Sequence, residues 1–299
     1  MQDSTYLIGV LLAIGAGISN NLGTLLQKKV INDRPIGAKV GRSLLKTPLW
    51  MLGLLLQLAL GTAFFMLAID MIGPALTPGL MAAGLIVLAV GAVKVIGEQL
   101  KVGEYIGIIL MVIAIAFLGF SELDTGTHIE DLLNIGDTGF IIRICIFTGI
   151  LGTIAIVCHV LQKVKERYKG LYLAIFSGCM FSISNFWVAP LVAVISSVFS
   201  GTFLPIQLVF FILAAVILVL TNFLGILKIQ QSFIYGQASN MIPIQQVPIQ
   251  ISPIFIYFAV VLLMPDLVYS MPFMIAGVGL IIISSFLLAK RQAQLEKIK

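Results

Sequence analysis

The sequence predicts an all-α integral membrane protein with nine transmembrane helices. Three observations lead to this fold class. The chain has 299 residues, of which 60% are hydrophobic and only 10% are charged, whereas a soluble domain carries about 25% charged residues. Its mean hydropathy is +1.11. Its apolar residues are gathered in long runs, and a run of about 20 crosses the hydrocarbon core of a bilayer as a helix.

Nine apolar runs are long enough to span a membrane. We expect helices at residues 6–27, 48–69, 74–96, 104–121, 139–161, 171–198, 206–228, 238–264 and 271–290. The first run follows a single charged residue, Asp3, so it lacks the basic segment of a signal peptide and is expected to be a retained helix. The three cysteines, Cys145, Cys158 and Cys179, all fall in apolar runs, so we expect small packed side chains and no disulfide framework.

The connections between these runs carry the charges. The first, third, fifth and seventh connections and the C-terminal tail hold every lysine and arginine except Arg143. The fourth connection is acidic instead, with Glu122, Asp124, Glu130, Asp131 and Asp137. Basic loops stay in the cytoplasm, so we expect the N-terminus outside, the C-terminus in the cytoplasm and an odd number of spans. The net charge of +5 therefore indicates topology, and no nucleic-acid partner is expected.

Two identical polar triplets indicate an internal duplication. Residues 18–20 and 183–185 both read Ile-Ser-Asn, and their first residues are 165 positions apart. The same offset relates Pro78 to Pro243 and Gln57 to Asn222. Helices 1–4 then match helices 6–9, and five spans separate equivalent helices, so the two repeats face opposite ways. This inverted 4+1+4 repeat is typical of alternating-access transporters, whose site lies near the midplane between repeats.

The duplication divides the chain into four regions. Residues 1–121 form the first repeat, and residues 122–170 hold the acidic outer loop, the fifth helix and a basic inner loop. Residues 171–290 form the second repeat, and residues 291–299 form a basic cytoplasmic tail.

A set of neutral amides lies deep in the predicted helices. We expect the substrate to be bound by Asn20, Asn21, Gln57, Asn185, Asn222, Gln246 and Gln250. This set is rich in oxygen and contains no ionisable residue, so a cation or a neutral polar solute fits it better than an anion. The alternative, that these amides only form hydrogen bonds between helices, stays open.

The eighth predicted helix contains Pro243, Pro248 and Pro253, one proline every five residues. Each proline removes a backbone hydrogen bond and frees the carbonyl group four residues earlier. A stripe with helical spacing, namely Ser239, Pro243, Gln246, Gln250 and Pro253, is predicted to form a cavity wall. Together with Pro78, the three prolines are expected to break or gate their helices. The alternative is a kinked packing helix.

The stretch GEQLKVGEYIGIILMVIAIAFLGF resembles the repeat ending of the drug/metabolite transporter (EamA-like) superfamily. Within that superfamily the chain is most similar to the NIPA-type magnesium transporters. The segments that carry this similarity are GISNNLGTLLQKKVI, TPLWMLGLLLQLALGTAFFMLAIDMIGPALTPGLMAAG and IYGQASNMIPIQQVPIQ. The resemblance implies a nine-helix fold and magnesium transport. One departure is at residues 60–65, Leu-Gly-Thr-Ala-Phe-Phe, where those transporters usually have Gly-Glu-x-x-Asn-Phe.

These observations leave three functions open. The first is an alternating-access transporter that takes up a divalent cation such as magnesium. The second is a transporter or exporter of small polar organic or drug-like solutes, and the third is a membrane scaffold or sensor without transport. No nucleophile–base pair or nucleotide fingerprint is found, so we expect neither an enzyme nor a cofactor, and no metal ligands are assigned. The expected partners are the transported cation or solute and the lipid of a cell membrane that the chain crosses several times. A homodimer is left open.

Overall fold

A computed structural model of the chain describes residues 2–33, 44, 46–81, 83–97, 101–121, 137–262, 264–265 and 267–295. Every regular element in these residues is a helix. Five helices are long and apolar enough to cross a membrane: Leu7–Asn32, Pro48–Ile72, Thr138–Val164, Glu166–Ser200 and Pro205–Tyr235. Gly84–Ile96, Val102–Leu118 and Ser270–Ser284 are shorter apolar helices. By helix length and composition, the chain is a multi-pass membrane protein, as the sequence predicts.

Nine helices make up the described part of the chain, which confirms the predicted all-α class and helix number. Five are single elements, namely α1 (Gln2–Asn32), α5 (Val102–Phe120), α7 (Thr138–Val164), α9 (Pro205–Tyr235) and α11 (Ser270–Leu295). Two more helices are formed by five consecutive elements, namely α2 (Pro48–Leu55), the π-helical η1 (Leu56–Gly61), α3 (Thr62–Met81), α4 (Gly84–Gly91) and the π-helical η2 (Ala92–Ile96). The second of the two begins inside α3. The last two are η3 (Glu166–Tyr168) with α8 (Lys169–Ser200), and α10 (Ala238–Phe255) with η4 (Ile256–Val260).

The helix ends follow from local chemistry. α2 and α9 begin with Pro48 and Pro205, because the first turn of a helix does not need the missing N–H group. α7 begins after Asp137, whose carboxylate accepts hydrogen bonds from Gly139 N and Phe140 N at 3.0 Å each. α8 ends at Gly201, which has a φ of 74° that other residues rarely adopt.

The chain reverses direction inside α3. Along α1, Ile72 lies beside Gly9, Phe64 beside Gly15 and Met81 beside Gly17. The order of these neighbours means that the chain runs antiparallel to α1 up to Ile72 and has turned back along it by Met81. The reversal therefore falls between Ile72 and Met81, and the sequence placed the boundary between the second and third helices at residues 70–73, at the start of this interval.

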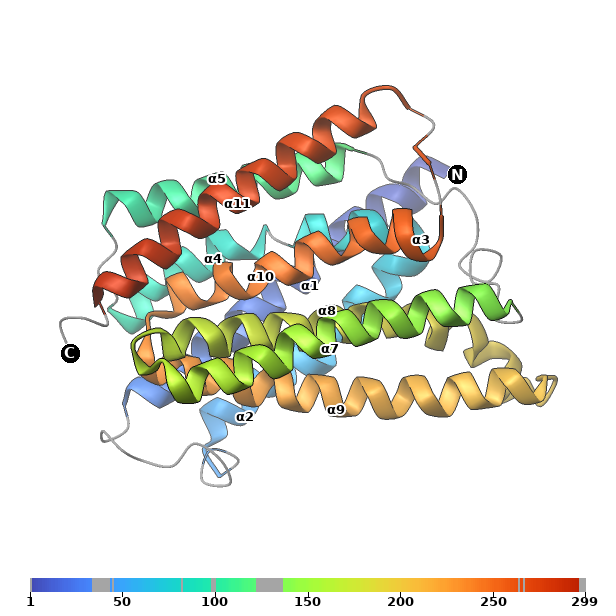
Figure 1. Cartoon of the computed structure of the whole chain (residues 1–299), viewed down its shortest axis with the longest axis horizontal. Helices are drawn as coiled ribbons and strands as arrows, with labels where there is room; N and C mark the ends of the chain where they lie inside the picture. Colours follow the sequence, from blue (N-terminus) through green and yellow to red (C-terminus); the bar gives the residue numbers. More distant parts are fainter. Residues whose placement is uncertain are drawn as a thin grey trace.

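The helices form one bundle (Figure 1), and two large apolar cores lie within its described residues. α5 and α11 pack side by side along one edge, and α7, α8 and α9 pack together along the other. α1, α4 and α10 lie between these groups. One core joins α1, α4, α5, α10 and α11 through residues that include Leu25, Leu85, Met111, Met241 and Ile281. The other joins α7, α8 and α9 through Phe140, Phe147, Phe186, Trp187 and Phe210.

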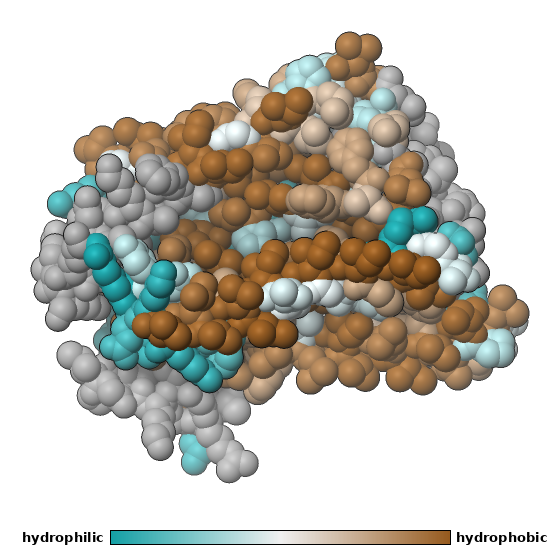
Figure 2. Space-filling model, in the orientation of Figure 1, coloured by the Kyte–Doolittle hydropathy of each residue, from teal (hydrophilic) through white to brown (hydrophobic). Residues whose placement is uncertain are grey.

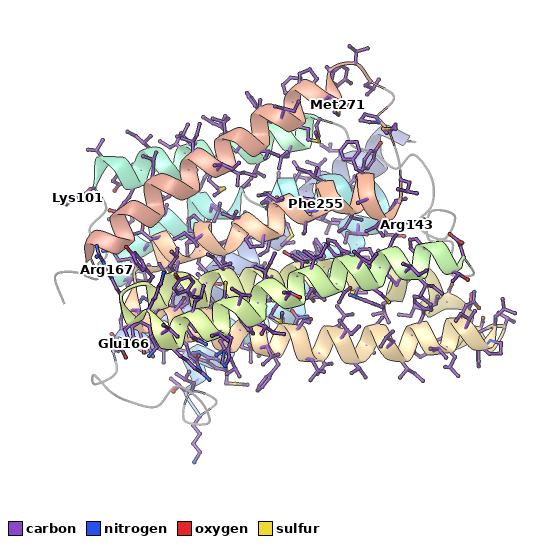
Figure 3. The ribbon with its side chains drawn as sticks, in the orientation of Figure 1. Lys101, Arg143, Glu166, Arg167, Phe255 and Met271 are labelled. Atoms are coloured by element: carbon purple, nitrogen blue, oxygen red, sulfur yellow. The ribbon has the colours of Figure 1, made fainter. Side chains whose placement is uncertain are left out.

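Charged residues gather at the two ends of the bundle. Figure 2 shows an apolar band over the middle of the visible face, with hydrophilic residues at its ends. Lys101, Glu166 and Arg167 lie at one end, called the basic end below, and Arg143 lies at the other (Figure 3). Arg143 pairs with Asp137 at 3.6 Å and donates to Val260 O at 2.8 Å, so this cation has local partners at the end that the sequence predicts to face outward. Which end faces the cytoplasm stays a prediction.

The structure bears on three details of the sequence prediction, namely the end of the first helix, the acidic loop and the cysteines. α1 continues to Asn32 instead of ending at residue 27, because Lys28 is buried against α9 and does not start a loop. The acidic residues Glu122, Asp124, Glu130 and Asp131, the side chains of Pro78 and Ser239, and residues 296–299 lie outside the described residues. All three cysteines are free, and Cys145 is exposed on the surface of α7.

Candidate functional site

A cavity of about 90 Å³ lies between the helices near the middle of α1. A buried water needs about 10–15 Å³ by this measure, so the space suits roughly six water molecules. Its wall includes all seven amides predicted from the sequence: Asn20, Asn21, Gln57, Asn185, Asn222, Gln246 and Gln250. The structure thus brings together side chains from α1, η1, α8, α9 and α10. Whether they bind a substrate stays a prediction.

Close backbone contact between α1 and α4 shapes the first side of the cavity. A methyl group at Gly17 would lie 1.8 Å from Met81 O, and one at Gly84 would lie 2.1 Å from Gly17 O. Small residues at such crossings let membrane helices approach closely. The approach places Asn20 and Asn21, one turn further along α1, on the cavity wall.

Gln57 reaches the cavity from the π-helical segment η1. A π-helical turn inserts an extra residue and changes the direction of the side chains around it, and such turns are frequent at functional sites. Gln57 is buried, and its Oε1 atom accepts a hydrogen bond from Gln27 Nε2 at 3.1 Å. Thus the second helix contributes an amide that is also tied to α1.

α8 and α9 form the opposite side. Asn222 Nδ2 donates to Ser184 Oγ at 2.6 Å and to Leu218 O at 2.8 Å, which fixes the amide of α9 against α8. Asn185 lies beside Ser184 on α8 and also lines the cavity. The two residues at matching positions of the predicted repeats, Asn20 and Asn185, therefore line the same cavity from opposite sides, and both are half-buried.

α10 contributes three polar residues to the lining, Gln245, Gln246 and Gln250. The helix continues through Pro243, Pro248 and Pro253, so none of these prolines ends it, and gating by them stays a prediction. Pro253 leaves the carbonyl group of Ile249 without its helical partner. Ser252 Oγ donates to this carbonyl at 3.3 Å.

The nitrogen atoms of several cavity amides are occupied by the protein. Asn21 Nδ2 donates to Gly17 O at 2.9 Å, Gln245 Nε2 to Ser177 Oγ at 2.7 Å, and Gln250 Nε2 to Gln246 Oε1 at 3.2 Å. Ser177 Oγ donates its own proton to Gly225 O at 2.7 Å, so it accepts from Gln245. These contacts and those of Asn222 occupy the amide nitrogens of Asn21, Asn222 and Gln245, whereas their carbonyl oxygens accept no hydrogen bond from the described residues.

Sequence reasoning missed Gln245 and Thr24, which also line the cavity. Gln245 directly precedes Gln246, which belongs to the predicted stripe on α10. The cavity is wide enough for both glutamines to line it. Two buried charged residues near the basic end, Lys28 and Glu104, were also missed. Their burial depends on contacts with α9 and α10, which no local pattern reveals: Lys28 donates to Phe233 O, and Glu104 accepts from Asn240 Nδ2 at 2.7 Å.

Within the described residues, no group of three or more histidine, cysteine, aspartate or glutamate side chains could hold a metal ion. Comparison with known proteins gives no match to a family model, to a curated protein or to a solved structure. The resemblance to the drug/metabolite transporter superfamily stays an interpretation of the sequence.

Proposed function

We propose that the chain is a membrane transporter of the drug/metabolite type that carries a cation, with a divalent cation such as magnesium as the leading candidate. The observation that carries this proposal is the orientation of the cavity amides. The nitrogen atoms of Asn21, Asn222 and Gln245 donate to the protein, while the carbonyl oxygens of these three cavity-lining residues accept no hydrogen bond from the described residues. Oxygen atoms are the ligands that hard cations prefer.

The size of the cavity supports a hydrated ion. Magnesium gives up its water molecules reluctantly and usually keeps several of them in proteins. Room for roughly six water molecules, in a cavity of about 90 Å³, allows an ion to keep part of its hydration shell while amide oxygens replace the rest. Two charges that move through 100 mV release about 4.6 kcal/mol, so uptake needs no coupled ion.

The arrangement of helices supports alternating access. The start of α8 lies near the end of α1, since Lys169 stacks over Tyr235 and Lys28 binds Phe233 O, both at the end of α9. α1 and α8, the first helices of the two predicted repeats, therefore run in opposite directions, as an inverted repeat requires. The cavity lies between them, where transporters with such repeats bind their substrates.

The test is magnesium entry into vesicles that contain the purified protein, under an imposed inside-negative potential. We expect entry to rise with the potential and to be lost in Asn20→Leu and Gln246→Leu. Gln231→Leu is the matched control, because this half-buried amide accepts from Lys228 at 3.3 Å and is not part of the cavity wall. Absence of entry, in vesicles shown to hold folded protein, would exclude magnesium uniport.

A specific observation favours a second candidate, the transport of small organic cations. Phe65 and Phe181 also line the cavity, and aromatic rings bind organic cations through their faces. Entry of an organic cation that magnesium does not inhibit would select this function. If neither ion enters, while the leucine variants change only the melting temperature, the amides are structural and a scaffold or sensor is the better description.

A further inference from the structure

The cavity is closed toward the basic end by a chain of three amides. Gln230 Nε2 donates to Gln27 Oε1, and Gln27 Nε2 donates to Gln57 Oε1 at 3.1 Å. Gln27 is 0% exposed and Gln230 is 1% exposed, so water does not pass between them. Thr24 and Ile229 line the cavity just before this chain, which therefore marks the floor of the cavity.

On the basic-end side of the three amides, Lys28 connects the end of α1 to the end of α9. Its ammonium group donates to Phe233 O at 2.5 Å and to Gly236 O at 3.0 Å, and it lies 5.3 Å from the centre of the Phe233 ring. The last carbonyl groups of a helix lack partners and carry partial negative charge, so they favour a cation. Lys28 is only 4% exposed. A positive charge thus sits across the path from the cavity to the basic end.

These contacts join the two halves of the protein, because α1 belongs to the first half and α9 to the second. We propose that Gln27, Gln230 and Lys28 form the gate that closes the cavity at the basic end, and that Gln57 links this gate to the occupancy of the cavity. The proposal rests on the proposed transport function. Passage toward the basic end requires that the amide bridge and both lysine contacts separate.

Gln57 provides the link because one side chain serves both sites. Gln57 Oε1 accepts from Gln27 Nε2, and Gln57 also lines the cavity. A cation that takes this oxygen as a ligand comes close to the positively polarised N–H group of Gln27 and repels it. Binding in the cavity therefore weakens the amide chain, which is the differential interaction that a ligand needs to shift a conformational equilibrium.

The test is thiol labelling, which does not depend on transport. Thr24→Cys is introduced into a chain whose three cysteines are replaced by alanine, and a charged, membrane-impermeant thiol reagent is added on one side of sealed vesicles. A second protein with Lys165→Cys, an exposed position at the basic end, reports that the reagent is present on that side. The measured quantity is the rate at which the cysteine at position 24 is labelled from the basic end.

We expect Lys28→Met to raise this rate at least tenfold, because it removes both charge-assisted contacts with the carbonyl groups of α9 from a two-state gate. Lys28→Arg keeps the charge and the donors and should stay within about threefold of the parent. Lys29→Met is the matched control, because this half-exposed lysine of the same helix turn shows no carbonyl contact among the described residues. An unchanged rate in Lys28→Met, with normal labelling from the opposite side as proof of folding, would overturn the gate.

Magnesium is the probe for the link through Gln57. We expect magnesium to raise the labelling rate of the parent from the basic end, and to have no such effect in Gln57→Leu. Equal effects in both proteins would refute the link. Magnesium entry is measured in the same vesicles and separates the two proposals. If Lys28→Met raises the labelling rate but no magnesium enters the vesicles, the gate is supported and magnesium transport is rejected. If magnesium enters but Lys28→Met leaves the labelling rate unchanged, only the gate is rejected.

Discussion

The contact between α1 and α4 gives the sharpest test of the cavity geometry. A methyl group at Gly17 would lie 1.8 Å from Met81 O and 2.6 Å from the carbonyl carbon of the same residue. Unstrained contacts between carbon and other heavy atoms are near 3.5 Å, so Gly17→Ala forces the two backbones apart by more than 1 Å. Overpacking of this kind costs about 3 kcal/mol, at the upper end of the usual range, because a backbone cannot rotate away as a side chain does.

The assay is thermal unfolding in one detergent. A loss of about 3 kcal/mol corresponds to a fall of roughly 5 °C in the melting temperature of a chain of this size. The matched control is Gly149→Ala on α7, where a methyl group meets no atom within 4 Å among the described residues. This control should melt within about 2 °C of the parent or slightly above it, since alanine favours helices. Equal melting temperatures for Gly17→Ala and Gly149→Ala would refute the close approach of α1 and α4.

Three further predictions concern the second half of the molecule and the α5–α11 contact. Gly178→Ala places a methyl group 2.3 Å from Gln245 O, so it should lower both the melting temperature and cation entry into vesicles. Ser177→Ala removes the acceptor of Gln245 Nε2 and should reduce cation entry several-fold. Cation entry at the same rate as in the parent protein would contradict the proposed amide orientation. Gly277→Ala meets Ala114 O at 2.8 Å between α11 and α5, away from the cavity, so it should cost about 1–3 kcal/mol in the melting assay and leave the entry per folded molecule unchanged.

The seven amides could be found from the sequence because a membrane makes isolated polar groups costly. An asparagine or glutamine in an apolar run has to face protein or water, so seven such residues point to a common interior. The offset of 165 added the second argument, since it paired Asn20 with Asn185 and Gln57 with Asn222 before their positions in space were known. The structure brings these two pairs to one cavity.

The gate could not be found in this way. Gln27 and Lys28 stand at the end of an apolar run, where polar residues normally mark the membrane surface, so the sequence placed the end of the first helix there. Gln230 lies two positions beyond the end of the seventh predicted helix, at residue 228. Only the contact of α1 with α9, which are about 200 positions apart in sequence, shows that these residues are buried together.

The predicted duplication also gives the gate a counterpart at the other end of the bundle. Adding 165 to position 27 gives Val192, and subtracting it from position 230 gives Phe65. Both residues belong to one apolar cluster, which also contains Ala16 and Val188. Under the predicted duplication, residues of this apolar cluster therefore take the place that the amide bridge has at the basic end.

This difference between the two ends has a consequence for transport. Separation of Val192 from Phe65 breaks no hydrogen bond, whereas separation of Gln27 from Gln230 leaves buried amides without partners until water enters, at a cost of about 1–3 kcal/mol for each group. The end with the apolar contact is therefore the easier one to open in the empty protein. A cation at Gln57 lowers the cost at the basic end, because Gln57 accepts the hydrogen bond from Gln27 in the amide bridge there and also lines the cavity. In the proposed transporter, these two unequal ends favour entry at the apolar end and release at the basic end, which is the direction of uptake under the predicted topology, with the basic end in the cytoplasm.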